Sequence, residues 1–313
     1  MGRIIITGAD GNMGRKVVET IVELVPKEDL ILTAPRIEKI AGYAEQGYDC
    51  READYGNPAQ LEQAFSGGET LAFISLPQVG SKRRKMHTNA LMAAKAAGVE
   101  RIVYTSITGA QLLENAGYEI ADHRYTEYLI DALGFDHVFL RNSQYAEAMI
   151  AAVETAAKTT GVIRNNMGDG LMAHVSRNDC AVALACAAAG DFHDEEFFIS
   201  GDKLRTITEF IEIVAPAFGA EVSYEFITDE ENYAELDAMG IPRETDGKWV
   251  TEEARNSPFC GRGMVTFGAA IRQNQMSSFS DDFERITGRQ KTTLAEMVAN
   301  IGEYGIGDRN ATD

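Results

Sequence analysis

The sequence predicts an α/β protein built on a doubly wound parallel sheet, with a smaller, discontinuous C-terminal part. Short β-branched runs alternate with longer segments of helical periodicity, and about six such alternations occupy roughly the first 140 residues. The first run, Arg3–Thr7, leads at once into glycines, as expected of a buried parallel strand. Together these observations predict helices on both faces of one sheet.

The first half of the chain supplies the strands and helices of this sheet. Strands are expected where runs are short and apolar, and helices where apolar residues recur every three to four positions. Gly98 follows the fourth expected helix as a C-terminal cap. The expected strands are Arg3–Thr7, Leu30–Thr33, Tyr48–Ala53, Leu71–Ser75, Arg101–Thr105 and His137–Leu140, and the expected helices are Met13–Leu24, Ile37–Glu45, Leu61–Phe65, His87–Ala97 and Asp122–Leu133.

The second half is less regular. Arg164–Leu171 holds two glycines and two asparagines, which indicate a loop or a hairpin. We expect residues 1–150, joined by 175–203, to form the sheet domain, and 151–174 with 204–313 to form a smaller substrate-binding part. The expected helices are Ala151–Lys158, Asp179–Ala189, Thr206–Phe218 and Glu230–Gly240, and the expected strands are Glu196–Ile199 and Glu221–Phe226.

Composition and charge exclude several classes of partner. The chain has 29 basic and 48 acidic residues and a net charge of −19, so nucleic acid and anionic membrane surfaces would repel it. No apolar run reaches the roughly 18 residues that span a bilayer, and the strand at Arg3 leaves no room for a signal peptide. Neither the four cysteines nor the histidines have the spacing of a metal site, and these cysteines indicate a reduced, cytoplasmic setting.

A glycine-rich segment between the first strand and the first helix carries the strongest functional signal. Gly8 allows a tight turn, Gly11 lets the backbone approach a pyrophosphate, and Gly14 permits close packing of helix on sheet. Main-chain N–H groups and the helix dipole would then hold a diphosphate, which predicts a Rossmann-type dinucleotide site. A purely structural turn is the weaker alternative. The residues expected to contact the cofactor here are Gly8, Asp10, Gly11, Asn12, Met13 and Gly14.

The end of the second strand indicates which dinucleotide is bound. An NAD site usually has Asp or Glu there, whereas this chain has Arg36, with Lys39 one turn further on. A guanidinium can pair with a 2′-phosphate, which favours NADP(H). NAD(H) stays possible, because Arg36 could be only a solvated residue at a helix start. Asp54 and Tyr55, after the third strand, are placed to border the adenine.

Several motifs together resemble a known family. The chain is similar to the NmrA-like group of atypical short-chain dehydrogenase/reductases, above all to bacterial NAD(P)H:quinone oxidoreductases and triphenylmethane reductase, and more distantly to plant isoflavone and phenylcoumaran benzylic ether reductases. The family contains NADP(H)-dependent reductases and also cofactor-sensing regulators without catalysis. The matching motifs are Gly8-x-x-Gly11-x-x-Gly14, Asp54-Tyr55, Ala93–Val99, Tyr104-Thr105-Ser106, Leu140-Arg141-Asn142, Ser176–Asp179 and Asp282–Gly288.

The chain departs from the usual catalytic pair of short-chain dehydrogenases. No lysine occurs between Lys95 and Lys158, which excludes a Tyr-x-x-x-Lys pair there. The resemblance implies that His123 takes the position where the plant ether reductases have a lysine. A histidine that titrates near neutrality can act as an acid or base. His123 is therefore the candidate catalytic residue, either as a proton donor or by positioning ligands. The remaining alternative is a structural hydrogen bond.

Other candidates follow the ends of later strands, where open α/β sheets bind ligands. Ser75, Leu76 and Pro77 end the fourth strand, Thr105 and Ser106 the fifth, and Asn142 and Tyr145 follow the sixth; all seven are expected to contact the cofactor or line its pocket. The basic run Lys82–Lys85 is expected to be a solvated helix start. Trp249, with Met and Phe residues of the second half, could line an apolar substrate cleft or pack in the core.

The expected function is hydride transfer from NADPH to a small apolar aromatic or conjugated acceptor. The resemblance, and not the composition, implies the acceptor classes: a quinone, an aromatic carbonyl, a dye or a benzylic ether. The cofactor would carry the chemistry and the protein would position both reactants. A non-catalytic NADP(H) sensor of the NmrA type is the alternative. The sequence leaves a monomer and a dimer equally open.

Overall fold

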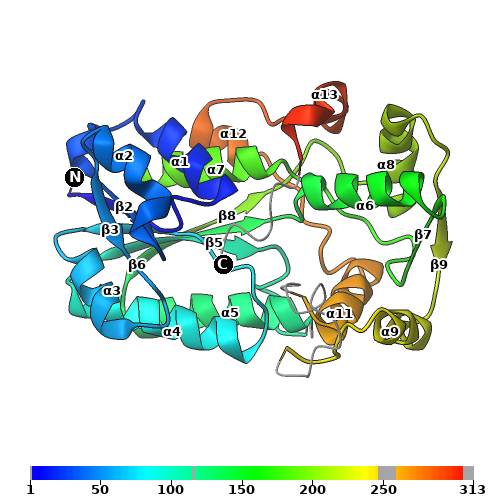
Figure 1. Ribbon diagram of the computed structural model, residues 1–313, viewed down its shortest axis with the longest axis horizontal. Coiled ribbons are helices and arrows are strands. Elements are labelled where there is room, and N and C mark those ends of the chain that lie inside the picture. The colour runs from blue at the N-terminus through cyan, green and yellow to red at the C-terminus, as the bar shows by residue number, and fades with distance from the viewer. Residues whose placement is uncertain (1, 115–116, 246–258, 306–313) are drawn as a thin grey trace.

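A computed structural model, which describes residues 2–114, 117–245 and 259–305, confirms the predicted α/β class (Figure 1). Its main sheet has seven strands in the order β3-β2-β1-β4-β5-β6-β8, and every neighbouring pair is parallel. The strands are β1 (Ile4–Ile6), β2 (Leu30–Ala34), β3 (Asp49–Glu52), β4 (Thr70–Phe73), β5 (Arg101–Ile107), β6 (Asp136–Asn142) and β8 (Glu195–Ile199).

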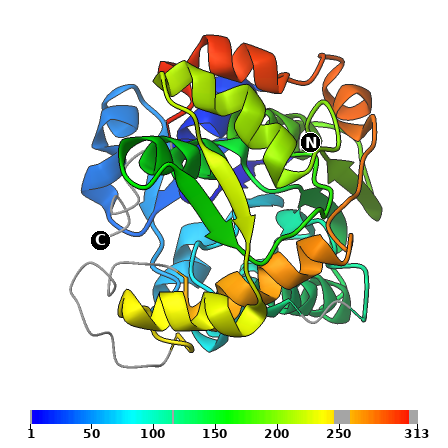
Figure 2. The same cartoon turned by 90° about the vertical axis from the view of Figure 1, so that its right-hand side faces the viewer.

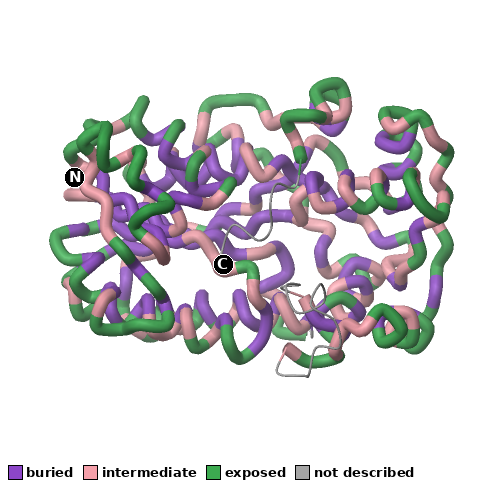
Figure 3. Tube along the Cα trace, viewed as in Figure 1, coloured by how far each residue is buried: buried purple, intermediate pink, exposed green. Residues whose placement is uncertain are grey.

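Helices cover both faces of this sheet, as Figure 1 shows. The two faces have separate apolar cores: Ile4 and Ile6 of β1 lie in one, and Ile5 lies in the other. The central strands are thus buried on both sides, which explains their continuous apolar runs, and Figure 3 shows buried segments gathered along them. One face is covered by α1 (Asn12–Ile21), α7 (Arg177–Ala189) and α12 (Asp282–Thr287), and the other by α3 (Pro58–Phe65), α4 (Ser81–Ala96) and α5 (Tyr118–Ala132).

A smaller part lies beyond the carboxyl ends of the strands and is built around a second sheet (Figure 2). Its two strands, β7 (Val162–Asn165) and β9 (Ser223–Phe226), pair in parallel. The surrounding helices are α6 (Ala146–Lys158), α8 (Ile207–Val214), α9 (Asp229–Ala238), α11 (Gly261–Arg272) and α13 (Leu294–Ala299). Short helices complete the described chain: η1 (Lys27–Asp29), η2 (Ile37–Ile40), α2 (Ala41–Glu45), η3 (Ala215–Phe218) and η4 (Ile301–Glu303).

Some expectations for local structure are wrong. Of the loop or hairpin expected at 164–171, the hairpin does not form, because 162–165 pairs in parallel with β9 and a hairpin would require antiparallel strands. Residues 166–171 form a loop. Helix α11 was not predicted from the sequence, because Gly261, Gly263 and Gly268 weaken its helical signal. Helices α4, α5 and α6 also begin four to six residues before their expected starts, and in α4 the added first turn is the polar stretch 81–84, whose helical signal is weak. Their tertiary contacts override this weak local signal.

The topology places a ligand crevice at one position in the sheet. The strand order reverses between β1 and β4, which are neighbours although they are distant in the sequence. In open α/β sheets, ligands bind outside the carboxyl ends of the strands at such a switch point. Among the described residues, none of the helices combines the length and apolar character needed to cross a bilayer.

Candidate active site

The glycine loop begins where β1 ends and leads directly into α1. Gly8 has a φ of +60°, a conformation that favours glycine. A Cβ on Gly14 would lie 2.0 Å from the carbonyl oxygen of Gly8, so only glycine allows this contact between helix and loop. Ala9 N–H donates to the Thr33 carbonyl oxygen at 2.9 Å, which ties the loop to the end of β2.

The space beside Gly8 and Gly11 is open. A Cβ added at Gly8 would meet no atom within 4 Å, and one at Gly11 would meet only the Gly8 carbonyl oxygen at 3.4 Å. Gly11 is the N-cap of α1 and has no side chain to cap it, and the first turn holds no acidic residue. The positive end of the helix dipole is thus left for an anion.

Three cations surround Asp10 beside the loop. Burial is the main cause that raises the pKa of Asp10, while its own backbone amide and the charges of Lys39, Arg15 and Arg36 act in the opposite direction. Among the described residues, none of these three cations forms an ion pair, which is notable in a chain of net charge −19. Arg36 is half-buried and precedes η2. Arg15 was not predicted from the sequence, although its position directly after Gly14 in the first turn of α1 was a usable signal.

Met13 and Tyr145 lie together, although they are distant in the sequence. The Tyr145 hydroxyl donates to Met13 Sδ at 3.7 Å, so the start of α6 lies against the first turn of α1. Asn12 is exposed in the same turn. The expected cofactor residues of the first and sixth strand ends are therefore brought to one place.

The pair after β3 divides into an exposed and a buried residue. Asp54 is exposed, and its Oδ1 accepts from Gly56 N–H at 2.8 Å. Tyr55 is buried, with its ring centroid 5.8 Å from that of Phe73. Of the two side chains expected to border an adenine, only Asp54 therefore lies on an open surface.

The loop after β4 is held by side chains from β5 and α4. Ser75 N–H donates to Thr105 Oγ1 at 2.8 Å, and Leu76 N–H donates to His87 Nε2 at 3.2 Å. Ser75 and Leu76 are half-buried and Pro77 is exposed. His87 Nε2 acts as an acceptor, so His87 is neutral here, and burial holds its pKa well below the usual value.

Ser106 belongs to a buried charged network. Its hydroxyl donates to Glu127 Oε1 at 2.5 Å, and Glu127 also accepts two bonds from Arg141, at 3.0 and 2.8 Å. Arg141 also pairs with Glu196. The hydroxyl of Ser106 is thus used within the protein.

His123 lies in the second turn of α5, facing β5. Its Nδ1 is 2.9 Å from the hydroxyl of Tyr104, and that hydroxyl is 3.5 Å from Ser75 Oγ. Burial, followed by the nearby charges of Arg83 and His87, lowers the pKa of His123 well below its usual value. His123 is therefore neutral at pH 7. No hydrogen bond of its Nε2 occurs within the described parts of the chain, so this nitrogen is left for a ligand.

Arg83 corrects the expectation that the run 82–85 is only a solvated helix start. Lys82 and Lys85 are exposed, but Arg83 is 2% exposed and its Nη2 donates to Glu119 Oε1 at 3.0 Å. The positive charge of Arg83 is thereby placed near His123, where it disfavours the imidazolium. The sequence pattern could not show this, because the partner comes from α5.

Buried polar groups without a partner in the described chain lie at the end of β6 and shortly before α7. They are both side-chain atoms of Asn142, the hydroxyl of Ser143 and both ring nitrogens of His174. His174 packs with its ring centroid 4.6 Å from that of Phe210. Burial lowers the pKa of His174 to about 3. Trp249 lies outside the described residues.

We expect His174→Phe to make the protein less sensitive to acid. His174 takes up a proton near pH 6.5 in the unfolded chain but only near pH 3 in the folded chain. The neutral His174 therefore contributes fully to the free energy of unfolding above pH 6.5, and this contribution is lost as the pH falls. At pH 5 the loss is about 2 kcal/mol. The variant should show a smaller fall in Tm between pH 7 and pH 5. For His193 the pKa is raised by Asp136 and Asp191, so its contribution to stability is present at low pH and is lost as the pH rises. Equal changes in the pH dependence of Tm in His174→Phe and His193→Gln would contradict the assignment to His174.

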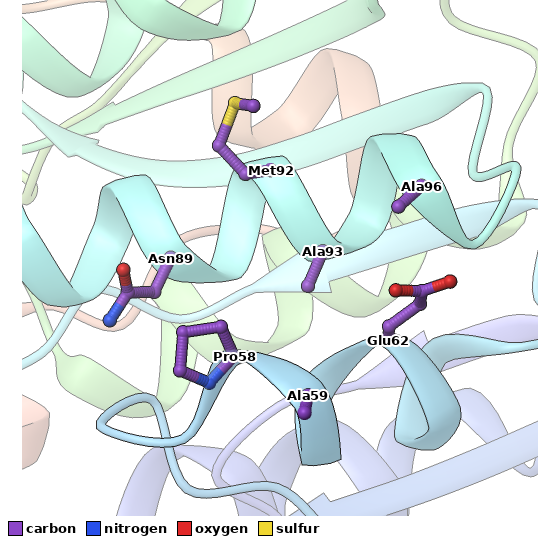
Figure 4. Close-up of a pocket in the computed structure, with 7 residues that line it drawn as sticks. All are labelled: Pro58, Ala59, Glu62, Asn89, Met92, Ala93 and Ala96. Atoms are coloured by element: carbon purple, nitrogen blue, oxygen red, sulfur yellow. The ribbon is translucent and has the colours of Figure 1, made fainter.

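A separate depression lies between α3 and α4 (Figure 4), with a volume of about 250 Å³. It shares no residue with the glycine loop, and Glu62 is its only charged lining residue. It therefore does not suit a dinucleotide. In the described ranges, no group of three or more His, Cys, Asp or Glu side chains is arranged to hold a metal ion.

Comparisons with known proteins agree with this geometry. Residues 8–189 match the model of a family described as NAD(P)H-binding. The chain is 32% identical to quinone oxidoreductase 2 of Escherichia coli over 302 residues, which cover 95% of this chain and 98% of the relative.

Solved structures give the same result. The structure of an NADPH-dependent quinone oxidoreductase from Escherichia coli complexed with NADPH is similar, with a TM-score of 0.83 and 29% identity over 96% of this chain and 99% of that one. The triphenylmethane reductase of Citrobacter sp. complexed with NADP(H) has a TM-score of 0.79 and 28% identity, over 95% of this chain and 99% of that one.

Proposed function

This chain is an oxidoreductase of the NAD(P)H-binding family, as its NmrA-like motifs predicted, and from that premise we propose that it reduces quinones with NADPH. The observation that carries the proposal is the open glycine loop with three cations that form no ion pair in the described chain, at the switch point between β1 and β4. His123 lies against Tyr104 of β5, the strand next to β4. Aromatic carbonyls, conjugated dyes and benzylic ethers are further candidate acceptors.

In this proposal the chain holds the cofactor through main-chain and cationic groups. Main-chain N–H groups at the N-terminus of α1, beside Gly8 and Gly11, bind the diphosphate. The 2′-phosphate is bound by the positive charges of Arg36, Lys39 and Arg15. NADPH, when bound, supplies a hydride from its nicotinamide ring. The neutral His123 presents Nε2 toward the acceptor, and we expect the smaller C-terminal part to cover the bound acceptor. All four cysteines are free, which suits a reduced, cytoplasmic setting.

The cofactor part of the proposal predicts a change of preference in Arg36→Ala. NADPH affinity should fall about 10- to 100-fold, because a charge-assisted bond to the 2′-phosphate is worth about 1.5–3 kcal/mol. NADH lacks that phosphate and should bind as before. Calorimetry with both nucleotides measures the difference, and Lys158→Ala controls for the loss of one positive charge. Equal losses for both nucleotides would contradict 2′-phosphate recognition by Arg36.

The catalytic part is tested with two kinds of acceptor. A quinone needs a hydride and a proton to form the hydroquinone, whereas a cationic triphenylmethane dye needs only the hydride to form its neutral reduced product. We expect the protein to oxidise NADPH when quinones of a panel are supplied as acceptors. The reaction is monitored through the loss of NADPH absorbance at 340 nm. Tight NADPH binding with neither acceptor consumed would overturn the proposal and indicate an NADP(H) sensor.

A further inference from the structure

We propose that the hydroxyl of Tyr104 is a positioning group that fixes the tautomer of His123 and relays a proton to it from Ser75. This inference rests on the proposed quinone reduction. It concerns Tyr104 of β5, which no expectation from the sequence included among the site residues. The three groups form one line: Ser75 Oγ, Tyr104 Oη at 3.5 Å from it, and His123 Nδ1 at 2.9 Å from Oη.

The chemistry of a neutral imidazole requires such a partner. His123 is neutral because burial and the charge of Arg83 disfavour the imidazolium. If a neutral imidazole gave up its only N–H proton, it would become imidazolate, a strong base that a buried site does not stabilise. It can therefore act as an acid only if its other nitrogen takes up a proton at the same time. The group within reach of that nitrogen is the Tyr104 hydroxyl.

The distances indicate the direction of the hydrogen bonds. The Tyr104 hydroxyl has one proton, which its geometry lets it donate to Ser75 Oγ at 3.5 Å or to His123 Nδ1 at 2.9 Å, and Nδ1 is the nearer acceptor by 0.6 Å. We therefore assign Tyr104 as the donor to Nδ1. This bond places the imidazole proton on Nε2, the nitrogen without a partner in the described chain, where it faces the acceptor.

The two ends of the line differ in access to water. Tyr104 is fully buried and burial raises its pKa, so its hydroxyl keeps a proton at rest. Ser75 is half-buried and follows β4 at the rim of the sheet, so it can exchange protons with solvent. Long contacts of this kind in ligand-free enzymes commonly tighten when the substrate is bound.

The step balances as one proton shift along the line. As hydride reaches the quinone, the Nε2 proton of His123 passes to the quinone oxygen and the Tyr104 proton passes to Nδ1. Ser75 Oγ stands as an acceptor toward Tyr104 in this structure, so its hydroxyl turns to donate its proton to Tyr104, and water restores Ser75. The quinone is reduced, NADPH is oxidised and water supplies the net proton. When the product leaves, water protonates Nε2 and the reverse shift restores the first tautomer.

The test is Tyr104→Phe, which keeps the ring that packs 5.4 Å from Phe73. We expect kcat for a quinone to fall at least about tenfold, with KM unchanged and turnover of a cationic triphenylmethane dye within about twofold of wild type. Tyr125→Phe, an exposed tyrosine two residues after His123, is the control and should leave both activities unchanged.

A spectroscopic readout tests the tautomer without turnover. Imidazole ¹⁵N shifts of the protein, with the His123 signal identified by its loss in His123→Gln, should show protonated Nε2 in wild type and a changed ratio of tautomers in Tyr104→Phe. Protonated Nδ1 in wild type, or equal losses with quinone and dye, would overturn the relay. If wild type reduces quinones but Tyr104→Phe is equally active, the relay fails and the proposed function stands. If wild type reduces no quinone, the proposed function fails.

Discussion

Gly14→Ala is expected to lower NADPH affinity by about 5- to 140-fold and to lower the stability of the protein. The new Cβ would lie 2.0 Å from the Gly8 carbonyl oxygen, 2.7 Å from Gly8 C and 2.9 Å from Ala9 Cα. These are main-chain atoms, so no side chain can rotate away, and α1 must move from the loop. Overpacking costs typically 1–3 kcal/mol, and a tenfold change in affinity corresponds to about 1.4 kcal/mol. Calorimetry and thermal unfolding measure the two effects.

Two further glycines separate the effects. Gly42→Ala in α2 would meet no atom within 4 Å and should bind NADPH as wild type does. Gly11→Ala meets only the Gly8 carbonyl oxygen, at 3.4 Å, so it should fold normally, yet its methyl group would occupy space proposed for the diphosphate. Folded Gly11→Ala and Gly14→Ala proteins that both keep wild-type affinity would remove the diphosphate site from this loop.

The parts of the fold and site that the sequence predicted are those encoded locally. The first strand, the glycine loop and the first helix are adjacent in the sequence, so their spacing specified both the turn and the packing of Gly14 on Gly8. Continuous apolar runs likewise predicted strands that are buried on both faces. Arg36 was predicted by the same reasoning, because it lies two residues after the end of β2, and its role toward the cofactor stays a prediction.

The parts that the sequence could not predict depend on contacts between distant segments. Arg83 is buried because Glu119 of α5 pairs with it, and the basic run alone gave the opposite expectation. Strand β7 forms because β9 pairs with it from about 60 residues further on, as in the pair Val162 with Ser223. Tyr104 looked like an ordinary strand residue, and only its 2.9 Å contact with His123 gives it a chemical role in our proposal.

His123→Ala is expected to lower kcat for a quinone by roughly 10²- to 10⁴-fold, the range for the loss of general acid–base catalysis. The reduced quinone carries negative charge on an oxygen until a proton arrives, and Nε2 of His123 is the donor that we propose. A cationic dye gains no such charge, so its turnover should stay within about threefold of wild type.

This contrast between acceptors decides between the roles left open for His123. Loss of quinone turnover alone indicates proton donation, whereas an equal loss with quinone and dye indicates that His123 positions the cofactor or the acceptor. If turnover of both quinone and dye is unchanged in His123→Ala, His123 has only a structural role, through its contact with Tyr104 on β5. The control variant is His193→Gln. His193 is exposed and pairs, within the described chain, with Asp136 and Asp191 near the start of β6, at the end of the sheet opposite to the proposed site. Stopped-flow measurement of NADPH oxidation keeps the hydride-transfer step separate from product release, which would otherwise mask part of the effect.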